Sequence, residues 1–140
     1  MAKVVYTANA TVTGGRAHGH GVTDDGALDV QLRPPTEGGG TNPEQLFAVG
    51  YAACFEGALG AVGRRERLEV GDVSIASSVS LITGEDRTFG IAATLDVTLP
   101  QLSEEDAARV VAAAHEVCPY SNATRGNIEV TLIANGRPLS

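Results

Sequence analysis

Cysteine, tryptophan and basic residues are scarce in this 140-residue sequence. It has two cysteines, Cys54 and Cys118, and no tryptophan. Two thiols cannot build a disulfide-rich scaffold, so a redox or nucleophilic role has to be weighed against inert burial for each of them. The N-terminus lacks the succession of basic, apolar and small residues that marks a secretory signal peptide. We therefore expect a protein of the reducing cytoplasm.

The shortage of basic residues also limits the partners. Ten Lys and Arg oppose 17 Asp and Glu, which gives a formal net charge of −7. A nucleic acid or an anionic membrane would have to bind against this net field, and we expect neither as a partner. The length and the 43% apolar content suit one hydrophobic core, so we predict a single domain over residues 1–140.

The first third of the chain predicts three strands. Residues 4–13 are rich in β-branched side chains, and the pair Gly14-Gly15 is a strong turn signal before a second extended stretch at 17–23. A turn at 24–26 then leads into residues 28–32, where apolar and polar side chains alternate with the period of a half-buried strand.

A long apolar helix follows. Asn42 suits the N-cap, Pro43 suits the first helical position, and Gln45 suits the third position of a capping box. Between residues 46 and 63 the single charge is Glu56, so we expect this helix to be buried on nearly all sides. A transmembrane helix is the rival interpretation, which Glu56, the many glycines and the charge of the chain disfavour.

The second half predicts two strands, a helix and a last strand. Apolar side chains alternate over residues 73–81 and again over 89–99, as in a hairpin. Ser103 caps a second helix whose apolar stripe carries Cys118 toward the core, where Pro119 stops the helix. Residues 128–134 form the last strand. The order βββ-α-ββ-α-β belongs to the α+β class.

Three of the six aromatic residues lie beside the first cysteine. At 100° per residue, Phe47, Tyr51 and Phe55 form a ridge on the first helix with Cys54 at its edge. Aromatic side chains at helical spacing are most often core residues. The functional alternative is an apolar substrate pocket next to a thiol.

A nucleophilic cysteine needs a positive charge that stabilises its thiolate. Arginine suits this role because its fork can hold a carboxylate on one edge and face the sulfur with another. The residues alone leave three candidates open: Arg16, Arg33 and Arg125.

Glu44 precedes Cys54 by ten residues, which is about 15 Å along a continuous helix and too far for contact. If both belong to one site, the helix is interrupted, an arginine spans part of the gap, or Glu44 comes from a second copy of the chain.

The histidines and the other charged or glycine-rich segments give weaker signals. His18 and His20 would share one face of a strand, but without a third ligand we predict no metal site. His115 falls on the polar side of the second helix, where we expect a solvated or capping side chain. Residues 64–67 are expected to be a solvated helix end, and residues 38–40 lack the lysine and the spacing of a phosphate-binding loop.

Several segments together resemble a known family. Residues 41–48, 50–55 and 118–127, with Gly14-Gly15-Arg16 and residues 25–30, are similar to the organic hydroperoxide resistance (Ohr) branch of the Ohr/OsmC superfamily. The resemblance runs in order over essentially the whole chain. It implies an OsmC-like fold with two antiparallel sheets around central helices, in an intertwined homodimer.

The resemblance also implies a function. Members of this branch are thiol peroxidases without metal or bound cofactor that reduce alkyl and fatty-acid hydroperoxides to alcohols. Cys54 would be the peroxidatic cysteine, which becomes a sulfenic acid and then forms a disulfide with Cys118. Arg16 and Glu44 match the activating pair. The dihydrolipoyl groups of lipoylated proteins would reduce the disulfide.

A second hypothesis comes from a different functional class. The chain would then be a redox sensor or an apolar-ligand-binding protein of the same fold, whose cysteines report oxidation without efficient turnover. A catalytic assay separates the two hypotheses.

Overall fold

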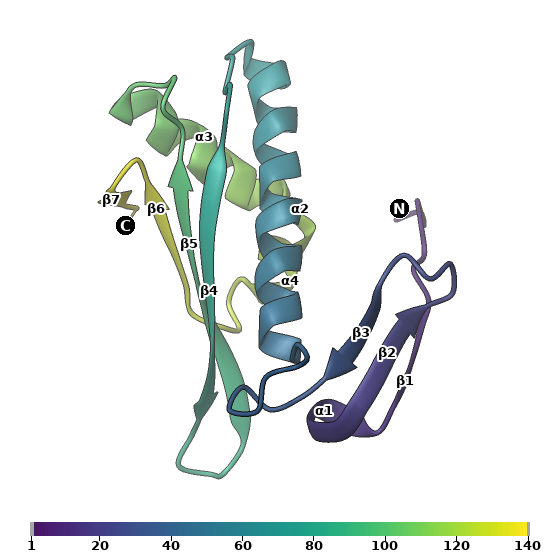
Figure 1. Ribbon diagram of the computed structural model, residues 1–140. Coiled ribbons are helices and arrows are strands. Elements are labelled where there is room, and N and C mark those ends of the chain that lie inside the picture. Colours follow the sequence, from purple (N-terminus) through teal and green to yellow (C-terminus); the bar gives the residue numbers. More distant parts are fainter. Residues whose placement is uncertain (1, 140) are drawn as a thin grey trace. The chain divides into compact units, whose positions relative to one another are not determined.

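The N-terminal part of the chain folds as a small antiparallel sheet (Figure 1). The computed structural model describes residues 2–139 and divides them into two compact units, with the boundary between Leu46 and Phe47. The sheet of the first unit has the order β1-β2-β3, with β1 at Ala10–Thr13, β2 at Gly19–Thr23 and β3 at Asp29–Leu32. The three predicted N-terminal strands are thus present, the first of them shorter than predicted.

A helical turn separates the first two strands, where the sequence predicted extended chain. Helix α1 covers Gly15–His18, so the prediction that His18 and His20 lie on one strand is wrong. Gly14 makes this turn possible: its φ is +80°, and a Cβ atom there would lie 2.4 Å from the carbonyl oxygen of His18. His20 does lie on β2, where its Nε2 is 2.6 Å from a carboxylate oxygen of Asp29.

Helix α2 (Pro43–Glu66) begins at the predicted residue and continues without interruption into the second unit. The side-chain oxygen of Asn42 accepts a hydrogen bond of 2.8 Å from the backbone N–H of Gln45, as an N-cap does. The capping box is not completed. The side chain of Gln45 instead accepts a hydrogen bond of 2.7 Å from the hydroxyl of Thr41.

The second unit contains a four-stranded sheet in the order β4-β5-β6-β7. Its strands are β4 (Ser74–Thr83), β5 (Phe89–Thr98), β6 (Val130–Ala134) and β7 (Arg137–Pro138). The predicted hairpin is confirmed, since β4 and β5 pair along their whole length. One pair departs from the antiparallel pairing that the resemblance implied, because β5 and β6 pair in parallel. Their connection crosses over through two helices, which is what a parallel pair needs.

These crossover helices are α3 (Glu104–Val117) and α4 (Pro119–Thr124). Ser103 caps α3 as predicted: its hydroxyl accepts a hydrogen bond of 3.1 Å from the backbone N–H of Asp106. The short helix α4 and strand β7 were not predicted. The α+β class is confirmed, with two sheets and four helices among residues 2–139.

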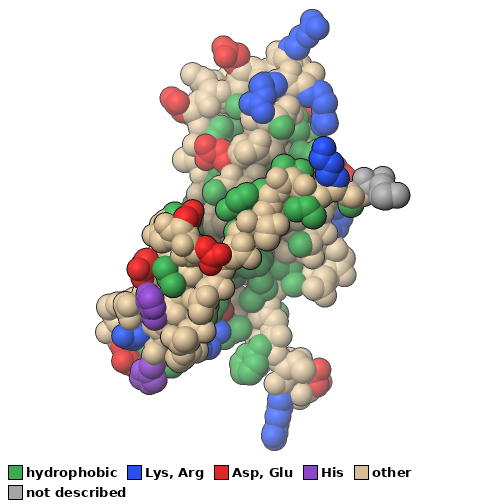
Figure 2. All heavy atoms as spheres, turned by 90° about the vertical axis from the view of Figure 1, so that its right-hand side faces the viewer, with side chains coloured by type: hydrophobic (Ala, Val, Ile, Leu, Met, Phe, Trp, Pro, Cys, Tyr) green, Lys and Arg blue, Asp and Glu red, His purple; other side chains and the backbone are tan. Residues whose placement is uncertain are grey.

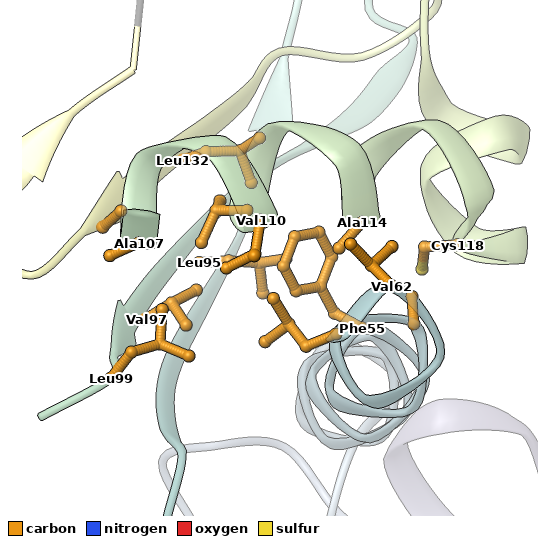
Figure 3. Packing of buried hydrophobic residues seen from close by; sticks show 14 of the residues in the cluster. Phe55, Val62, Leu95, Val97, Leu99, Ala107, Val110, Ala114, Cys118 and Leu132 are labelled. Carbon is orange, nitrogen blue, oxygen red and sulfur yellow. The ribbon is translucent and has the colours of Figure 1, made fainter. Parts of the chain in front are cut away.

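The core of the second unit lies where α2, α3 and β5 meet. Figure 3 shows Phe55 of α2 pointing toward Val110 of α3 and toward Leu95 of β5. The predicted stripe of α3 is confirmed at its buried positions, Ala107, Val110, Val111 and Ala114. Cys118 continues this stripe and is also fully buried.

Helix α2 is buried on one face only, which contradicts the prediction of burial on nearly all sides. The buried face carries Tyr51, Phe55, Leu59 and Val62, whereas Val49 is 71% exposed. Ala53, Glu56, Gly57 and Ala61 are also exposed. Hydrophobic side chains are visible on the molecular surface in Figure 2. In length and composition α2 fits a membrane span, a test that the core helix of a soluble protein also passes.

Candidate functional site

The two cysteines come from different helices and meet at the edge of the core. Cys54 lies on α2, is half-buried and packs against the core cluster. Cys118 is fully buried and lies between α3 and α4, because it ends the first helix and precedes the second. Both are free thiols. The structure therefore brings together the two residues that the sequence placed 64 positions apart.

The surroundings of Cys54 favour its protonated form. Burial raises the pKa of the Cys54 thiol above its ordinary value of 9.0, and the adjacent Cys118 raises it further. A hydrogen bond from the backbone N–H of Tyr120 acts in the opposite direction and lowers this pKa. For Cys54 to be a thiolate at neutral pH, a positive charge beyond these neighbours must therefore stabilise it.

Three aromatic rings pack together next to Cys54. The ring of Phe47 meets those of Tyr51 and Tyr120 edge to face, with centroids 6.0 and 5.5 Å apart. Gly50 allows the Tyr120 ring to lie against α2, because a Cβ atom at this position would be 2.8 Å from the Tyr120 hydroxyl oxygen. The absence of a side chain at Gly50 thus leaves room for the Tyr120 ring against α2.

An open apolar groove of about 580 Å³ adjoins this cluster. It is lined by Phe47, Ile91, Pro119, Tyr120, Ala123, Thr124, Asn127 and Ile128. Of the three predicted pocket residues, Phe47 lines the groove. Tyr51 and Phe55 are fully buried, and Phe55 points into the core (Figure 3). Phe55 is therefore a core residue, which was one of the two interpretations of the aromatic ridge.

The buried Tyr51 hydroxyl takes part in a chain of hydrogen bonds. It lies 2.8 Å from the Ser121 hydroxyl, which in turn lies 2.8 Å from Nδ1 of His115. The pKa of His115 is lowered by burial and by the nearby guanidinium of Arg125, which both disfavour the charged form of its ring. The expectation that His115 is simply a solvated or capping side chain is wrong, since its ring is half-buried and hydrogen-bonded.

The three candidate arginines have different partners. Arg16, on α1, forms an ion pair with Glu44, as the resemblance implied. Arg33 donates a hydrogen bond to the Leu32 carbonyl oxygen, and Arg125 donates one to the carbonyl oxygen of His115. Arg16 is therefore the candidate whose guanidinium is held by a carboxylate. Helix α2 is continuous, so an interruption of the helix does not explain how Glu44 and Cys54 could share a site. A spanning arginine and a second copy of the chain remain as explanations.

The sequence predicted no part in the site for three residues that shape it. The backbone of Tyr120 contacts Cys54, and Ser121 and His115 continue the hydrogen bonds of Tyr51. The sequence does hold a signal for Ser121 and His115, because a tyrosine on a buried helix face, such as Tyr51, requires a partner for its hydroxyl. No group of three metal-ligating side chains is found among residues 2–139.

What this arrangement can do chemically follows from the two thiols. Adjacent cysteines can alternate between a dithiol and a disulfide, and the half-buried one is accessible to a small oxidant. The groove is not lined by Cys54 itself, but it offers apolar contacts at Tyr120, the residue whose backbone contacts Cys54. Redox chemistry on an apolar ligand is thus within the reach of these side chains.

The chain matches known proteins over most of its length. Residues 36–133 match the model of the OsmC-like protein family. The sequence is 53% identical over 138 residues to the organic hydroperoxide resistance protein of Xanthomonas axonopodis pv. citri (strain 306). This match covers 93% of this chain and 94% of that protein.

Solved structures give the same result. An organic hydroperoxide resistance protein from Legionella pneumophila is 47% identical with a TM-score of 0.89, covering 94% of this chain and 98% of that one. The OhrB protein of Bacillus subtilis is 49% identical with a TM-score of 0.87, covering 93% and 98%. The chain belongs to the OsmC-like family and, within it, to the organic hydroperoxide resistance branch.

Proposed function

We propose that this protein is a thiol peroxidase that reduces organic hydroperoxides to alcohols, with Cys54 as the nucleophile. The observation that carries the proposal is the placement of Cys54 beside Cys118 and near an apolar groove. The names of the relatives, which refer to organic hydroperoxide resistance, support the choice of substrate class.

The reaction uses the two thiols in turn. The Cys54 thiolate attacks the distal oxygen of the hydroperoxide, the O–O bond breaks, and the alkoxide leaves with a proton as the alcohol. Cys54 is then a sulfenic acid. The Cys118 sulfur attacks the Cys54 sulfur, water leaves, and a disulfide forms. A dihydrolipoyl group of a partner protein reduces this disulfide by thiol–disulfide exchange and is itself oxidised.

The positive charge that Cys54 needs comes, in this proposal, from Arg16. Its guanidinium is held by Glu44, and the glycine turn before α1 positions it. Stabilisation of the thiolate by this cation would reverse the effect that burial has on the thiol. The carboxylate of Glu44 orients the guanidinium rather than acting on the sulfur.

The groove beside Phe47 and Tyr120 would hold the organic part of the substrate. Its lining is mostly apolar, and burying a hydrocarbon chain stabilises binding by about 0.8 kcal/mol for each methylene. Hydrogen peroxide has no apolar part to bury. A preference for organic hydroperoxides follows from this difference.

We also propose that the protein acts as a homodimer in the cytoplasm. The exposed face of α2, with Val49 and several small residues, is a surface that a second copy would cover. A reducing compartment is needed to keep both cysteines free between cycles.

A coupled assay tests the function. With lipoamide, lipoamide dehydrogenase and NADH, we expect the protein to consume tert-butyl hydroperoxide at least tenfold faster than hydrogen peroxide at equal concentrations. Turnover without this preference would contradict the role of the groove. No turnover, with Cys54 still oxidised once, would favour the redox sensor instead.

A further inference from the structure

Three hydrogen-bonding side chains lie beside the cysteines and take no part in the cycle proposed above. Tyr51 and Ser121 are fully buried, and His115 is half-buried. They come from α2, α4 and α3 respectively, which are the elements that carry or flank Cys54 and Cys118. Buried polar groups require partners, and here they are partners to one another at 2.8 Å for each step.

The spacing of these residues follows that of the cysteines. Tyr51 lies three residues before Cys54, about one helical turn away on α2. On the facing side, His115 lies three residues before Cys118 and Ser121 three residues after it. Ser121 therefore ties the helix that follows Cys118 both to the helix before it and to the helix of Cys54.

One assignment of protons satisfies the whole chain of hydrogen bonds. With the neutral ring of His115 protonated at Nε2, Nδ1 accepts from the Ser121 hydroxyl, and the Ser121 oxygen accepts from the Tyr51 hydroxyl. Thr124 lies 3.4 Å from the Tyr51 oxygen, and its hydroxyl donates to the Ser121 carbonyl oxygen at 3.2 Å. Each hydroxyl of this chain of hydrogen bonds thus has a partner.

We propose that Tyr51, Ser121 and His115 are positioning residues that hold the junction of α3 and α4 against α2, so that Cys118 stays in place to form a disulfide with Cys54. This inference rests on the proposed function. A disulfide requires the two Cα atoms to lie about 4.4 to 6.8 Å apart, so the position of the junction decides how readily the bond forms. Side chains that fix it before oxidation raise the effective concentration of one thiol toward the other.

The test measures the equilibrium between the dithiol and the disulfide. Wild-type protein, Tyr51→Phe and Ser121→Ala are equilibrated in glutathione redox buffers, and the Cys54 to Cys118 disulfide is quantified by alkylation and mass spectrometry. We expect each variant to disfavour the disulfide about fivefold, as the loss of one hydrogen bond predicts. That change equals about 20 mV, at 29.6 mV per tenfold.

Controls separate positioning from a general loss of stability. Ser78→Ala removes an exposed hydroxyl from β4 and should leave the equilibrium unchanged. A role in folding alone would weaken the reduced and oxidised forms equally and leave the equilibrium constant at the wild-type value, which would overturn the inference. If the wild-type protein forms no such disulfide, the proposed function fails first.

Variants at His115 keep the proposal testable if the buried variants do not fold. His115→Asn retains an acceptor near the position of Nδ1, whereas His115→Leu does not. We expect the Asn variant to stay within twofold of wild type and the Leu variant to shift about fivefold. In the double variant Tyr51→Phe with His115→Leu, the effects should not add, because both break one chain. Equal shifts for Asn and Leu, or additive effects, would contradict the inference.

Acid pH provides an independent readout. Protonated His115 becomes a donor at Nδ1 and can no longer accept from Ser121. The charged groups that face its ring are Arg125, which disfavours this protonation, and Glu116, which favours it. As the pH falls from 7.5 through the point at which NMR of the His115 ring shows its protonation, we expect the disulfide of the wild type to weaken relative to that of His115→Asn. Parallel behaviour of the two proteins would contradict the role of His115.

Discussion

The two cysteines have different surroundings, and replacing them should have different consequences. Cys54 is accessible to a small oxidant, whereas Cys118 is closed off in the core. We expect Cys54→Ser to abolish peroxide consumption. Cys118→Ser should permit one oxidation of Cys54 for each chain and then stall, because no second thiol is present to form the disulfide.

Stopped-flow measurement with one equivalent of tert-butyl hydroperoxide, followed by trapping of the sulfenic acid, checks this difference. A Cys118→Ser protein that never forms a sulfenic acid, or a Cys54→Ser protein that does, would reverse the two roles.

The acidity of Cys54 tests Arg16. In Cys118→Ser protein, which keeps a single thiol, we expect the guanidinium to lower the pKa of Cys54 below 9.0. In the same protein with Arg16→Leu, the effect of burial outweighs that of the Tyr120 N–H, and we expect the pKa of Cys54 to lie above 9.0. Absorbance of the thiolate at 240 nm during a pH titration measures both values. Each unit of difference should reduce the rate at pH 7 about tenfold.

The same shift predicts how stability depends on pH. With Arg16→Leu the folded chain keeps the Cys54 proton longer than the unfolded chain, so the free energy of unfolding falls as pH rises through 9.0. With Arg16 present the folded chain loses the proton first, and the free energy of unfolding rises up to pH 9.0. Urea denaturation of reduced protein between pH 6 and 10 checks the two slopes. Identical slopes would exclude Arg16 from the site.

Among the elements, the turn before α1 has the strictest backbone requirement. Gly14 and Gly26 both have positive φ, but an added Cβ atom meets backbone at Gly14 and open space at Gly26. We expect Gly26→Ala to cost about 1 kcal/mol of stability and to leave activity intact. Gly14→Ala should cost more and also lower peroxidase activity, because α1 carries Arg16. Thermal denaturation and the coupled assay measure both effects.

The elements that were predicted well have local causes. Asn42 and Ser103 cap their helices, and the alternation around β4 and β5 is long enough to define a hairpin. Helix α1 was missed because two glycines with positive φ allow a tight turn that residue preferences do not reveal. The sequence does not predict helix α4 because Pro119 indicates the end of a helix, although proline also suits the first position of the next one.

The site was predictable to the extent that its residues belong to recognisable segments. Cys54, Cys118 and the pair of Arg16 with Glu44 came from those segments. The contact of the Tyr120 backbone with Cys54 depends on how α4 packs against α2, which no pattern within either helix encodes. The same holds for the hydrogen bonds that join three helices through Ser121.

At the scale of the whole molecule, the exposed face of α2 predicts association. Ala61→Arg places a long charged side chain on this face, and we expect it to convert a dimer into monomers. Ala112→Arg makes the same change on the exposed face of α3 and serves as the matched control. Sedimentation velocity measures both. A monomeric wild type, or equal behaviour of the two variants, would contradict the proposed interface.

The bare backbone at Gly50 has a practical consequence. The phenol ring of Tyr120 packs against this backbone, and Tyr120 also lines the apolar groove. A methyl group at position 50 would push the ring outward and alter the width of the groove without touching either sulfur. If the groove holds the organic part of the substrate as proposed, position 50 is therefore a natural place to retune which hydrocarbon shapes fit it.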